Sequence, residues 1–189
     1  MRGLNYTDGC TAVVIMLVNN LLIAANIGDA RAVLARKKSG ANALEAFRLT
    51  FDHKPYEFSE TKRIKEMGGA VMEGRVAGLA VSRALGDFSN TFVSAEPFIQ
   101  KVNLAEGDYE NQFIILACDG VWDVLSDDYA VSMTNEYLSG SEAGKLQDKM
   151  LNNTNRLMNM AAARLRDCAL ACNSTDNISA IVVSLPKMK

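Results

Sequence analysis

Histidine and cysteine are scarce in this sequence, which limits the metal chemistry that it can support. Its 189 residues include one histidine, His53, and four cysteines. Because zinc sites are built largely from histidine and cysteine side chains, a single histidine excludes a histidine-rich zinc site. The cysteines form neither a Cys-x-x-Cys pair nor the dense spacing of a small secreted domain, so we expect buried free thiols. They are Cys10, Cys118, Cys168 and Cys172.

Long apolar runs and an excess of one charge are also missing. The longest apolar stretches, residues 11–18 and 113–118, are far shorter than the roughly 20 residues that a helix needs to cross a bilayer. No signal-peptide core is seen at the start of the chain. Twenty basic and 22 acidic residues give a net charge of −2, without a run that indicates nucleic-acid or membrane binding. We therefore predict a soluble protein of the cytoplasm or nucleus, with no nucleic-acid or membrane partner.

Proline-rich linkers are absent as well, since the sequence has only three prolines and no repeat or low-complexity tract. About half of the residues are apolar, at 49%. A chain of this length can bury one sizeable core but is too short for two ordinary domains. We predict that residues 1–189 form a single domain, or most of one.

Several short apolar runs predict strands. Residues 11–18, 21–25 and 30–36 are rich in β-branched side chains and are separated by turn-forming Asn and Gly residues, which predicts a meander of antiparallel strands. The apolar runs at residues 113–118 and 178–185 predict two further strands, each beside an acidic turn.

Three segments have the pattern of helices. Residues 57–67 predict a short surface helix, and residues 127–138 predict a helix capped by Ser126. A longer helix is expected to end near Cys172, and its apolar positions recur at steps of four, four, three and four. These positions are Leu157, Ala161, Leu165, Cys168 and Cys172. Strands with helices on their faces predict a layered α/β protein with mostly antiparallel sheets.

Four aspartates are candidates for a metal site. Asp29, Asp119 and Asp176 each lie in a turn next to a predicted strand, and Asp123 follows Asp119 by four residues. Mg²⁺ and Mn²⁺ prefer oxygen ligands, so a cluster made only of aspartates suits them. The alternative is that Gly-Asp and Asp-Gly pairs are simply common turn sequences. For any one of these aspartates taken alone, this simpler interpretation is preferable.

The aspartates belong to a series of motifs that run in order along nearly the whole chain. The motifs are Asp8-Gly9-Cys10-Thr11-Ala12-Val13, Asn26-Ile27-Gly28-Asp29-Ala30-Arg31-Ala32-Val33, Leu49-Thr50-Phe51-Asp52-His53-Lys54-Pro55, Leu79-Ala80-Val81-Ser82-Arg83-Ala84-Leu85-Gly86-Asp87, Leu116-Ala117-Cys118-Asp119-Gly120-Val121-Trp122-Asp123-Val124 and Ser174-Thr175-Asp176-Asn177-Ile178-Ser179. In this order they resemble the metal-dependent protein serine/threonine phosphatases of the 2C type. A set of ordered blocks is far more specific than one motif.

The resemblance implies a fold and a chemistry. The fold is an α/β, four-layer αββα sandwich of two antiparallel sheets flanked by helices, with a flap-like segment at about residues 53–78. The chemistry is hydrolysis of phosphoserine and phosphothreonine in a phosphoprotein substrate, by a water held on Mg²⁺ or Mn²⁺, so no side chain is the nucleophile. Asp119 and Asp176 match the ligands of the main metal centre. Asp29 and Asp123, with Asp119, match the ligands of a third, weaker metal.

The family pattern also contains elements that have no counterpart in this sequence. Members carry, in an N-terminal part, an Arg and a Glu-Asp pair, and a strand that ends in Asp-Gly-His-Gly-Gly. The resemblance assigns metal bridging, phosphate binding and proton donation to residues of these segments. We therefore expect a domain that is incomplete at the N-terminus, that binds Mg²⁺ or Mn²⁺ weakly and that has little activity alone.

Two functions stay open on this basis. The first is a protein serine/threonine phosphatase that needs the missing segment, and the second is a pseudophosphatase that serves as a scaffold or regulatory module. Strands missing from a sheet leave an unpaired edge, and such edges favour association. We accordingly expect contact with a regulatory protein partner or association through an uncovered sheet edge.

Overall fold

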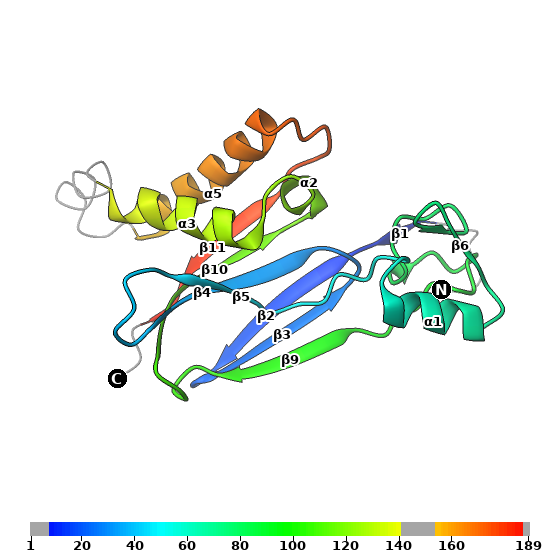
Figure 1. Cartoon of the computed structure of the whole chain (residues 1–189), viewed down its shortest axis with the longest axis horizontal. Helices are drawn as coiled ribbons and strands as arrows, with labels where there is room; N and C mark the ends of the chain where they lie inside the picture. Colours follow the sequence, from blue (N-terminus) through cyan, green and yellow to red (C-terminus); the bar gives the residue numbers. More distant parts are fainter. Residues whose placement is uncertain (1–7, 141–153, 187–189) are drawn as a thin grey trace.

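The computed structural model describes residues 8–140 and 154–186, and it has two antiparallel sheets stacked on each other (Figure 1). One sheet has four strands in the order β11-β10-β4-β5. Their bounds are β11 (Ala180–Ser184), β10 (Tyr109–Ala117), β4 (Arg31–Lys38) and β5 (Glu45–Arg48). The other has three strands in the order β2-β3-β9. These are β2 (Ala12–Val18), β3 (Leu21–Ile27) and β9 (Phe98–Asn103).

The predicted meander is right for its first two strands and wrong for the third. β2 and β3 pair antiparallel, but β4 pairs with β10 and β5 in the other sheet. The reason lies in burial on both faces of β4. Its Val33 packs in the core under the helices, and the next residue, Leu34, packs in the core between the sheets. The helices cover one face of β4 and the β2-β3 sheet covers the other, so β4 lies in a separate sheet that packs on β2 and β3.

Helices cover one face of the four-stranded sheet (Figure 1). They are α2 (Asp119–Trp122), α3 (Asp127–Ser139) and α5 (Thr154–Ala171). The predicted cap of α3 is present, because the backbone N–H of Tyr129 donates a hydrogen bond of 3.2 Å to Oγ of Ser126. The helix begins at Asp127, directly after this cap, as the sequence predicts. Asp127, in its first turn, accepts hydrogen bonds from Arg31 of β4 at 2.5 Å and from Arg48 of β5 at 2.8 Å. These ion pairs fix the helix over the sheet.

The buried face of α5 differs from the predicted one near its C-terminal end. Leu157, Ala161 and Leu165 are buried as expected, but the next buried residue is Ala169. Cys168 is partly buried against the same core, whereas Cys172 lies one residue beyond the end of α5 and is exposed. The four cysteines are free thiols, as predicted. The expectation that they are buried is wrong, since Cys10 and Cys172 are exposed and the other two are partly exposed.

A group of short elements lies beside one end of the sheets (Figure 1). The predicted helix in this region is present as α1 (Phe58–Glu66). Two short hairpin strands follow it, and two more pair nearby. These are β6 (Val71–Met72) with β7 (Arg75–Val76), and β1 (Gly9–Cys10) with β8 (Leu85–Gly86). The segment expected to resemble a flap, residues 53–78, lies in this group. That residues 1–189 form a single domain with this segment as its flap stays a prediction.

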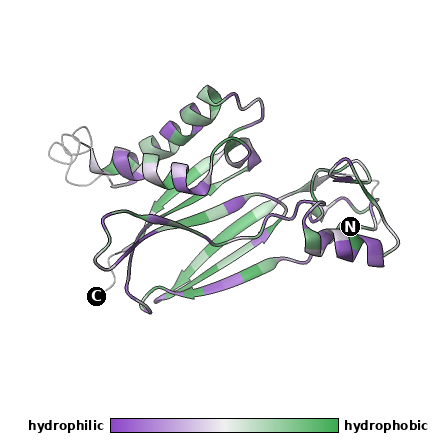
Figure 2. Cartoon of the chain, in the orientation of Figure 1, coloured by the Kyte–Doolittle hydropathy of each residue, from purple (hydrophilic) through white to green (hydrophobic). Residues whose placement is uncertain are grey.

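The outer face of the three-stranded sheet is apolar and exposed. Figure 2 shows mostly hydrophobic residues along β2 and β3. Large apolar side chains on these strands and on β9 stay solvent-accessible, among them Val14, Met16, Val18 and Ile99. Across the described residues no helix packs on this face, so three of the four expected layers are seen: helices, sheet and sheet. None of the described helices is long and apolar enough to cross a membrane.

The core between α5 and the four-stranded sheet predicts how stability responds to substitution. Leu165 is fully buried there, so Leu165→Ala is expected to lower the free energy of unfolding by about 2–5 kcal/mol. Leu170, on the same helix, is exposed, and Leu170→Ala should change it by less than about 0.5 kcal/mol. Urea denaturation of both variants measures the difference. Equal effects would mean that α5 does not pack through its Leu165 face.

Candidate metal and phosphate site

Three of the predicted aspartates meet at one end of the four-stranded sheet. The end of β10 pairs with the starts of both neighbours, because Ala117 lies opposite Arg31 of β4 and opposite Ala180 of β11. Asp119 follows Ala117 by two residues, Asp29 precedes β4, and Asp176 lies in the turn before β11. The antiparallel register therefore brings residues from three distant parts of the sequence to the same end of the four-stranded sheet.

The turns that carry Asp119 and Asp176 are held together by a series of hydrogen bonds. The backbone N–H of Cys118 donates to the carbonyl of Ser179 at 3.1 Å, and the Cys118 thiol lies 3.2 Å from the carbonyl oxygen of Asn177. Gly120 is needed for this approach, since a Cβ there would lie 2.3 Å from that same oxygen. The Ser174 hydroxyl donates to the carbonyl of Gly120 at 2.6 Å. The two turns are thus joined by hydrogen bonds and by close backbone contact.

A lysine that the sequence analysis did not assign lies among the aspartates. The ammonium group of Lys54 forms an ion pair with Asp29, whose side chain is nearly buried, and lies 3.8 Å from Oδ1 of Asp123. Lys54 belongs to the motif that precedes α1, so its place in the sequence gives no sign of this contact. Charge was the available indication of this contact, because a buried carboxylate needs a nearby cation or several hydrogen-bond donors.

The charges in this cluster affect one another. Burial, followed by the negative charges of Asp29 and Asp176, raises the pKa of Asp119 above its ordinary value. Burial lowers the pKa of Lys54, but the hydrogen bond to Asp29 and the charges of Asp29, Asp123 and Asp119 together outweigh burial, so the pKa is raised. All four predicted aspartates and Lys54 therefore lie within electrostatic reach of one another. This cluster is called the acidic cluster below.

The acidic cluster fits Mg²⁺ or Mn²⁺ in the type of its ligands but not in their number. Carboxylate oxygens are the donors that these ions prefer. However, the described residues contain no group of three Asp, Glu, His or Cys side chains that could hold one ion. Asp29, moreover, is already paired with Lys54. The assignment of Asp29, Asp119, Asp123 and Asp176 as metal ligands therefore stays a prediction.

Most of the chain matches a single protein family. The model described as Protein phosphatase 2C matches residues 3–178. The chain belongs to the protein phosphatase 2C family. Similar curated members include Protein phosphatase 2C homolog 1 of Schizosaccharomyces pombe, 38% identical over 187 residues. Another is the Integrin-linked kinase-associated serine/threonine phosphatase 2C of Homo sapiens, 36% identical over 184 residues.

These relatives are longer than this protein phosphatase 2C chain. Each match covers 95% of the chain, but only 46% of the fission yeast protein and 45% of the human one. The chain thus spans about half the length of the curated relatives that it matches.

Solved structures agree with the mixed α/β fold. A Caenorhabditis elegans sex determining protein has a TM-score of 0.72 at 23% identity, over 95% of this chain and 41% of its own, which shows a shared fold. The serine-threonine phosphatase 2C of Toxoplasma gondii has a TM-score of 0.67 at 25% identity, over 94% of this chain and 58% of its own. The predicted α/β fold class is confirmed.

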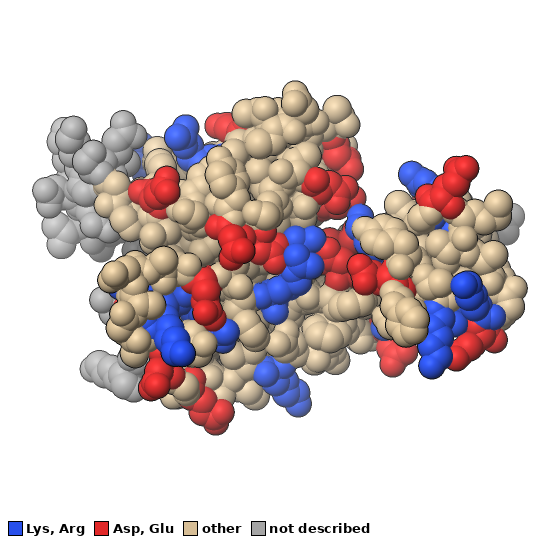
Figure 3. Space-filling view, in the orientation of Figure 1, with Lys and Arg blue, Asp and Glu red and all other residues tan. Residues whose placement is uncertain are grey.

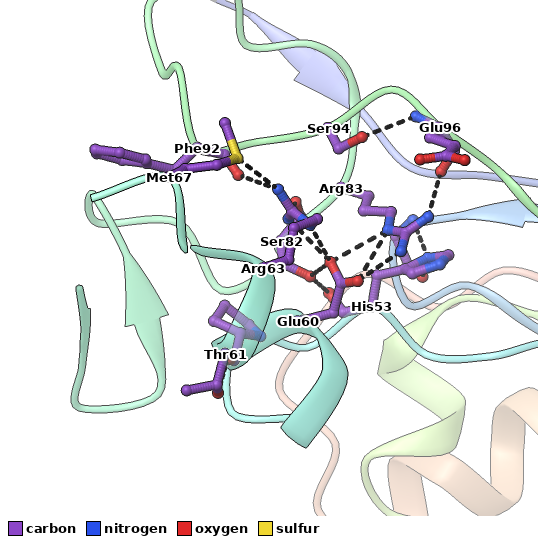
Figure 4. Close-up of polar contacts among 12 residues, drawn as sticks. His53, Glu60, Thr61, Arg63, Met67, Ser82, Arg83, Phe92, Ser94 and Glu96 are labelled. Carbon is purple, nitrogen blue, oxygen red and sulfur yellow. Dashed lines mark hydrogen bonds and ion pairs between the residues drawn. The ribbon is translucent and has the colours of Figure 1, made fainter. Parts of the chain in front are cut away.

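A second polar cluster fixes the short elements beside the sheets (Figure 4). The carboxylate of Glu60, in α1, is almost fully buried. It accepts hydrogen bonds from Arg83 at 2.6 Å, from the Ser82 hydroxyl at 2.7 Å and from Arg63 at 2.9 Å. Burial opposes its ionisation, but the hydrogen bonds from Arg83 and Arg63 dominate, and the pKa of Glu60 falls to about 2. Glu60 therefore joins α1 to the segment before β8.

The only histidine takes no part in the acidic cluster. His53 is fully buried, and its Nδ1 lies 3.1 Å from the backbone nitrogen and 2.9 Å from the carbonyl oxygen of Gly28. Burial, and next the positive charge of Arg83, lower the pKa of His53. The imidazole therefore supports the turn before Asp29.

On the face shown in Figure 3, acidic and basic side chains are interspersed rather than separated.

The low pKa of Glu60 gives a pH-dependent prediction. Because this pKa is below its ordinary value of about 4.5, the stabilisation is complete above pH 4.5 and is lost as the pH falls toward 2. Glu60→Gln is expected to lower the free energy of unfolding by about 3 kcal/mol at pH 7. Urea denaturation between pH 7 and pH 3 should show this difference shrinking below pH 4.5. Glu66→Gln, at an exposed position of α1, should have no such effect, and a pH-independent loss for Glu60→Gln would contradict the assignment.

The electrostatic interaction among the aspartates of the acidic cluster can be tested by titrating one of them. Asp176→Asn removes a negative charge that raises the pKa of Asp119, so the pKa of Asp119 is expected to fall. Carbon-detected NMR of the Asp119 carboxyl group, without added metal, measures the shift. The matched variant Asp167→Asn changes an exposed aspartate of α5 and should leave this pKa unchanged. An unchanged Asp119 titration in both variants would show that Asp119 and Asp176 do not interact.

Proposed function

We propose that this chain contributes to a protein serine/threonine phosphatase that hydrolyses phosphoserine and phosphothreonine in proteins. The observation that supports this most directly is the convergence of Asp29, Asp119 and Asp176 at one sheet edge, in a member of the protein phosphatase 2C family. Mg²⁺ or Mn²⁺ is the proposed cofactor, because the cluster offers only carboxylate oxygens. Asp119 and Asp176 are its proposed main ligands, with Asp29 and Asp123 for a weaker ion.

We propose further that residues 1–189 alone have little activity and bind the cofactor weakly. Divalent ions in hydrolytic sites supply an activated water and balance the charge of the phosphate, and they need several fixed ligands to do so. The described residues do not supply three ligands to one position. The ammonium of Lys54 partly neutralises the cluster, which weakens its attraction for a divalent ion. The chain would then provide part of a site that another segment completes.

The alternative is a pseudophosphatase that acts as a scaffold or regulatory module. The Lys54–Asp29 ion pair favours it, because it gives the buried carboxylate of Asp29 a cationic partner without a metal ion. The name of the human relative associates that protein with integrin-linked kinase. For this chain, a regulatory protein partner and a cytoplasmic or nuclear location remain predictions.

An activity assay with a supplied segment tests the proposal. Residues 1–189 alone should give no Mn²⁺-dependent hydrolysis of p-nitrophenyl phosphate above background. Joining them to the segment of a family member that ends in Asp-Gly-His-Gly-Gly should restore hydrolysis. Asp119→Ala should then abolish it, whereas Asp167→Ala, at an exposed site of α5, should leave it within about twofold.

The outcomes separate the two functions. Turnover by residues 1–189 alone would refute the proposed inactivity and show that fewer carboxylates suffice. No turnover after the segment is added would favour the pseudophosphatase. Calorimetry that finds zinc bound more tightly than manganese would contradict the proposed cofactor.

A further inference from the structure

Two thiols and a phenol lie together at the C-terminal end of α5. Cys168 is in the last turn of this helix, and Cys172 directly follows it. The Cys168 thiol donates a weak hydrogen bond of 3.8 Å to the hydroxyl oxygen of Tyr129. Tyr129 belongs to α3, which packs beside α5 (Figure 1). None of the three residues is a candidate ligand of the acidic cluster.

The two thiols are accessible to solvent and close to each other. Cys172 is exposed and Cys168 is partly exposed. The backbone N–H of Cys172 donates to the carbonyl of Cys168 at 2.9 Å, so the two residues are one helical turn apart. Desolvation, followed by the charge of Cys168, raises the pKa of the Cys172 thiol. Two thiolates at this spacing therefore repel each other, and a cation between them would remove that repulsion.

The spacing of the pair suits a bridging ion better than a disulfide. Side chains four residues apart on a helix have Cβ atoms about 5–6 Å apart. A disulfide needs its Cβ atoms at about 3.5–4.5 Å, so the helical turn would have to distort before Cys168 and Cys172 could form one. An ion bound to both sulfurs spans a wider gap, because it adds two metal–sulfur bonds of roughly 2.3 Å each.

The number of ligands selects the ion. Thiolate sulfur is a soft ligand, and it favours monovalent copper or zinc over Mg²⁺ and Mn²⁺. Structural zinc sites take four ligands, but the described residues contain no group of even three Asp, Glu, His or Cys side chains around one position. Monovalent copper, by contrast, is stable between two sulfur ligands. The pair therefore fits this ion by the type and by the number of its donors.

We propose that Cys168 and Cys172 bind one monovalent copper ion between their sulfurs. Each thiol releases its proton to solvent as its copper–sulfur bond forms, and the copper is neither oxidised nor reduced. The hydroxyl of Tyr129, which now accepts from the Cys168 thiol, can rotate and donate to the thiolate. This site goes beyond the proposed function, because its soft sulfur ligands select a different ion from the carboxylates of the acidic cluster.

Competition for copper tests the site. The probe is monovalent copper supplied as its coloured complex with bicinchoninate, under anaerobic and reducing conditions, and the full chain is expected to withdraw copper from it. Cys172→Ser should weaken binding by about 100-fold or more, since a second linked ligand raises affinity by about 10²–10⁴. Cys10→Ser removes another exposed cysteine and is the matched control, which should change the affinity less than about twofold. Circular dichroism of both variants confirms that they fold.

Each other result overturns the proposal. An equal loss of affinity in both variants would place the copper at other cysteines or between two chains. Displacement of the copper by an excess of Mn²⁺ would place it in the acidic cluster. A disulfide between Cys168 and Cys172 in the copper-free chain exposed to air, found by mass spectrometry, would show that the turn does not keep the sulfurs apart. An absence of copper uptake would show that the two thiols do not form a site.

Discussion

The pairing of β10 with its two neighbours is the constraint on which the remaining structure depends. One residue, Ala117, lies opposite the start of β4 and opposite the start of β11. Because antiparallel register is fixed residue by residue, this pairing sets where the following turn lies relative to the turns before β4 and β11. The same central strands divide the core into a part under the helices and a part between the sheets. The pairing of β10 thus determines both the arrangement of the core and the position of the acidic cluster.

Placing several carboxylates close together at one end of the four-stranded sheet has an electrostatic cost. Burial raises the pKa of the Asp119 carboxyl, and the nearby negative charges of Asp29 and Asp176 raise it further. Lys54, which lies against Asp29 and near Asp123, offsets part of this cost. A lysine can neutralise one charge, whereas a divalent ion needs several carboxylates at bonding distance. The acidic cluster therefore resembles a site with part of its ligands, and Lys54 neutralises part of its charge.

Local pattern in the sequence determined α1, α3, α5, the cap of α3 and five of the seven strands in the two main sheets. Ser126 caps α3, α1 ends before Gly68, and the β-branched runs become β2 and β3. β5 and β9 were not predicted, because charged and polar residues interrupt their apolar positions. The family motifs also indicated the four aspartates.

Tertiary structure alone decided which strands became neighbours. It moved β4 into the second sheet, turned the buried face of α5 toward Ala169 and brought Lys54 to Asp29. These features depend on contacts between residues far apart in sequence. Periodicity and turn propensity report only what a residue does near its own position in the chain.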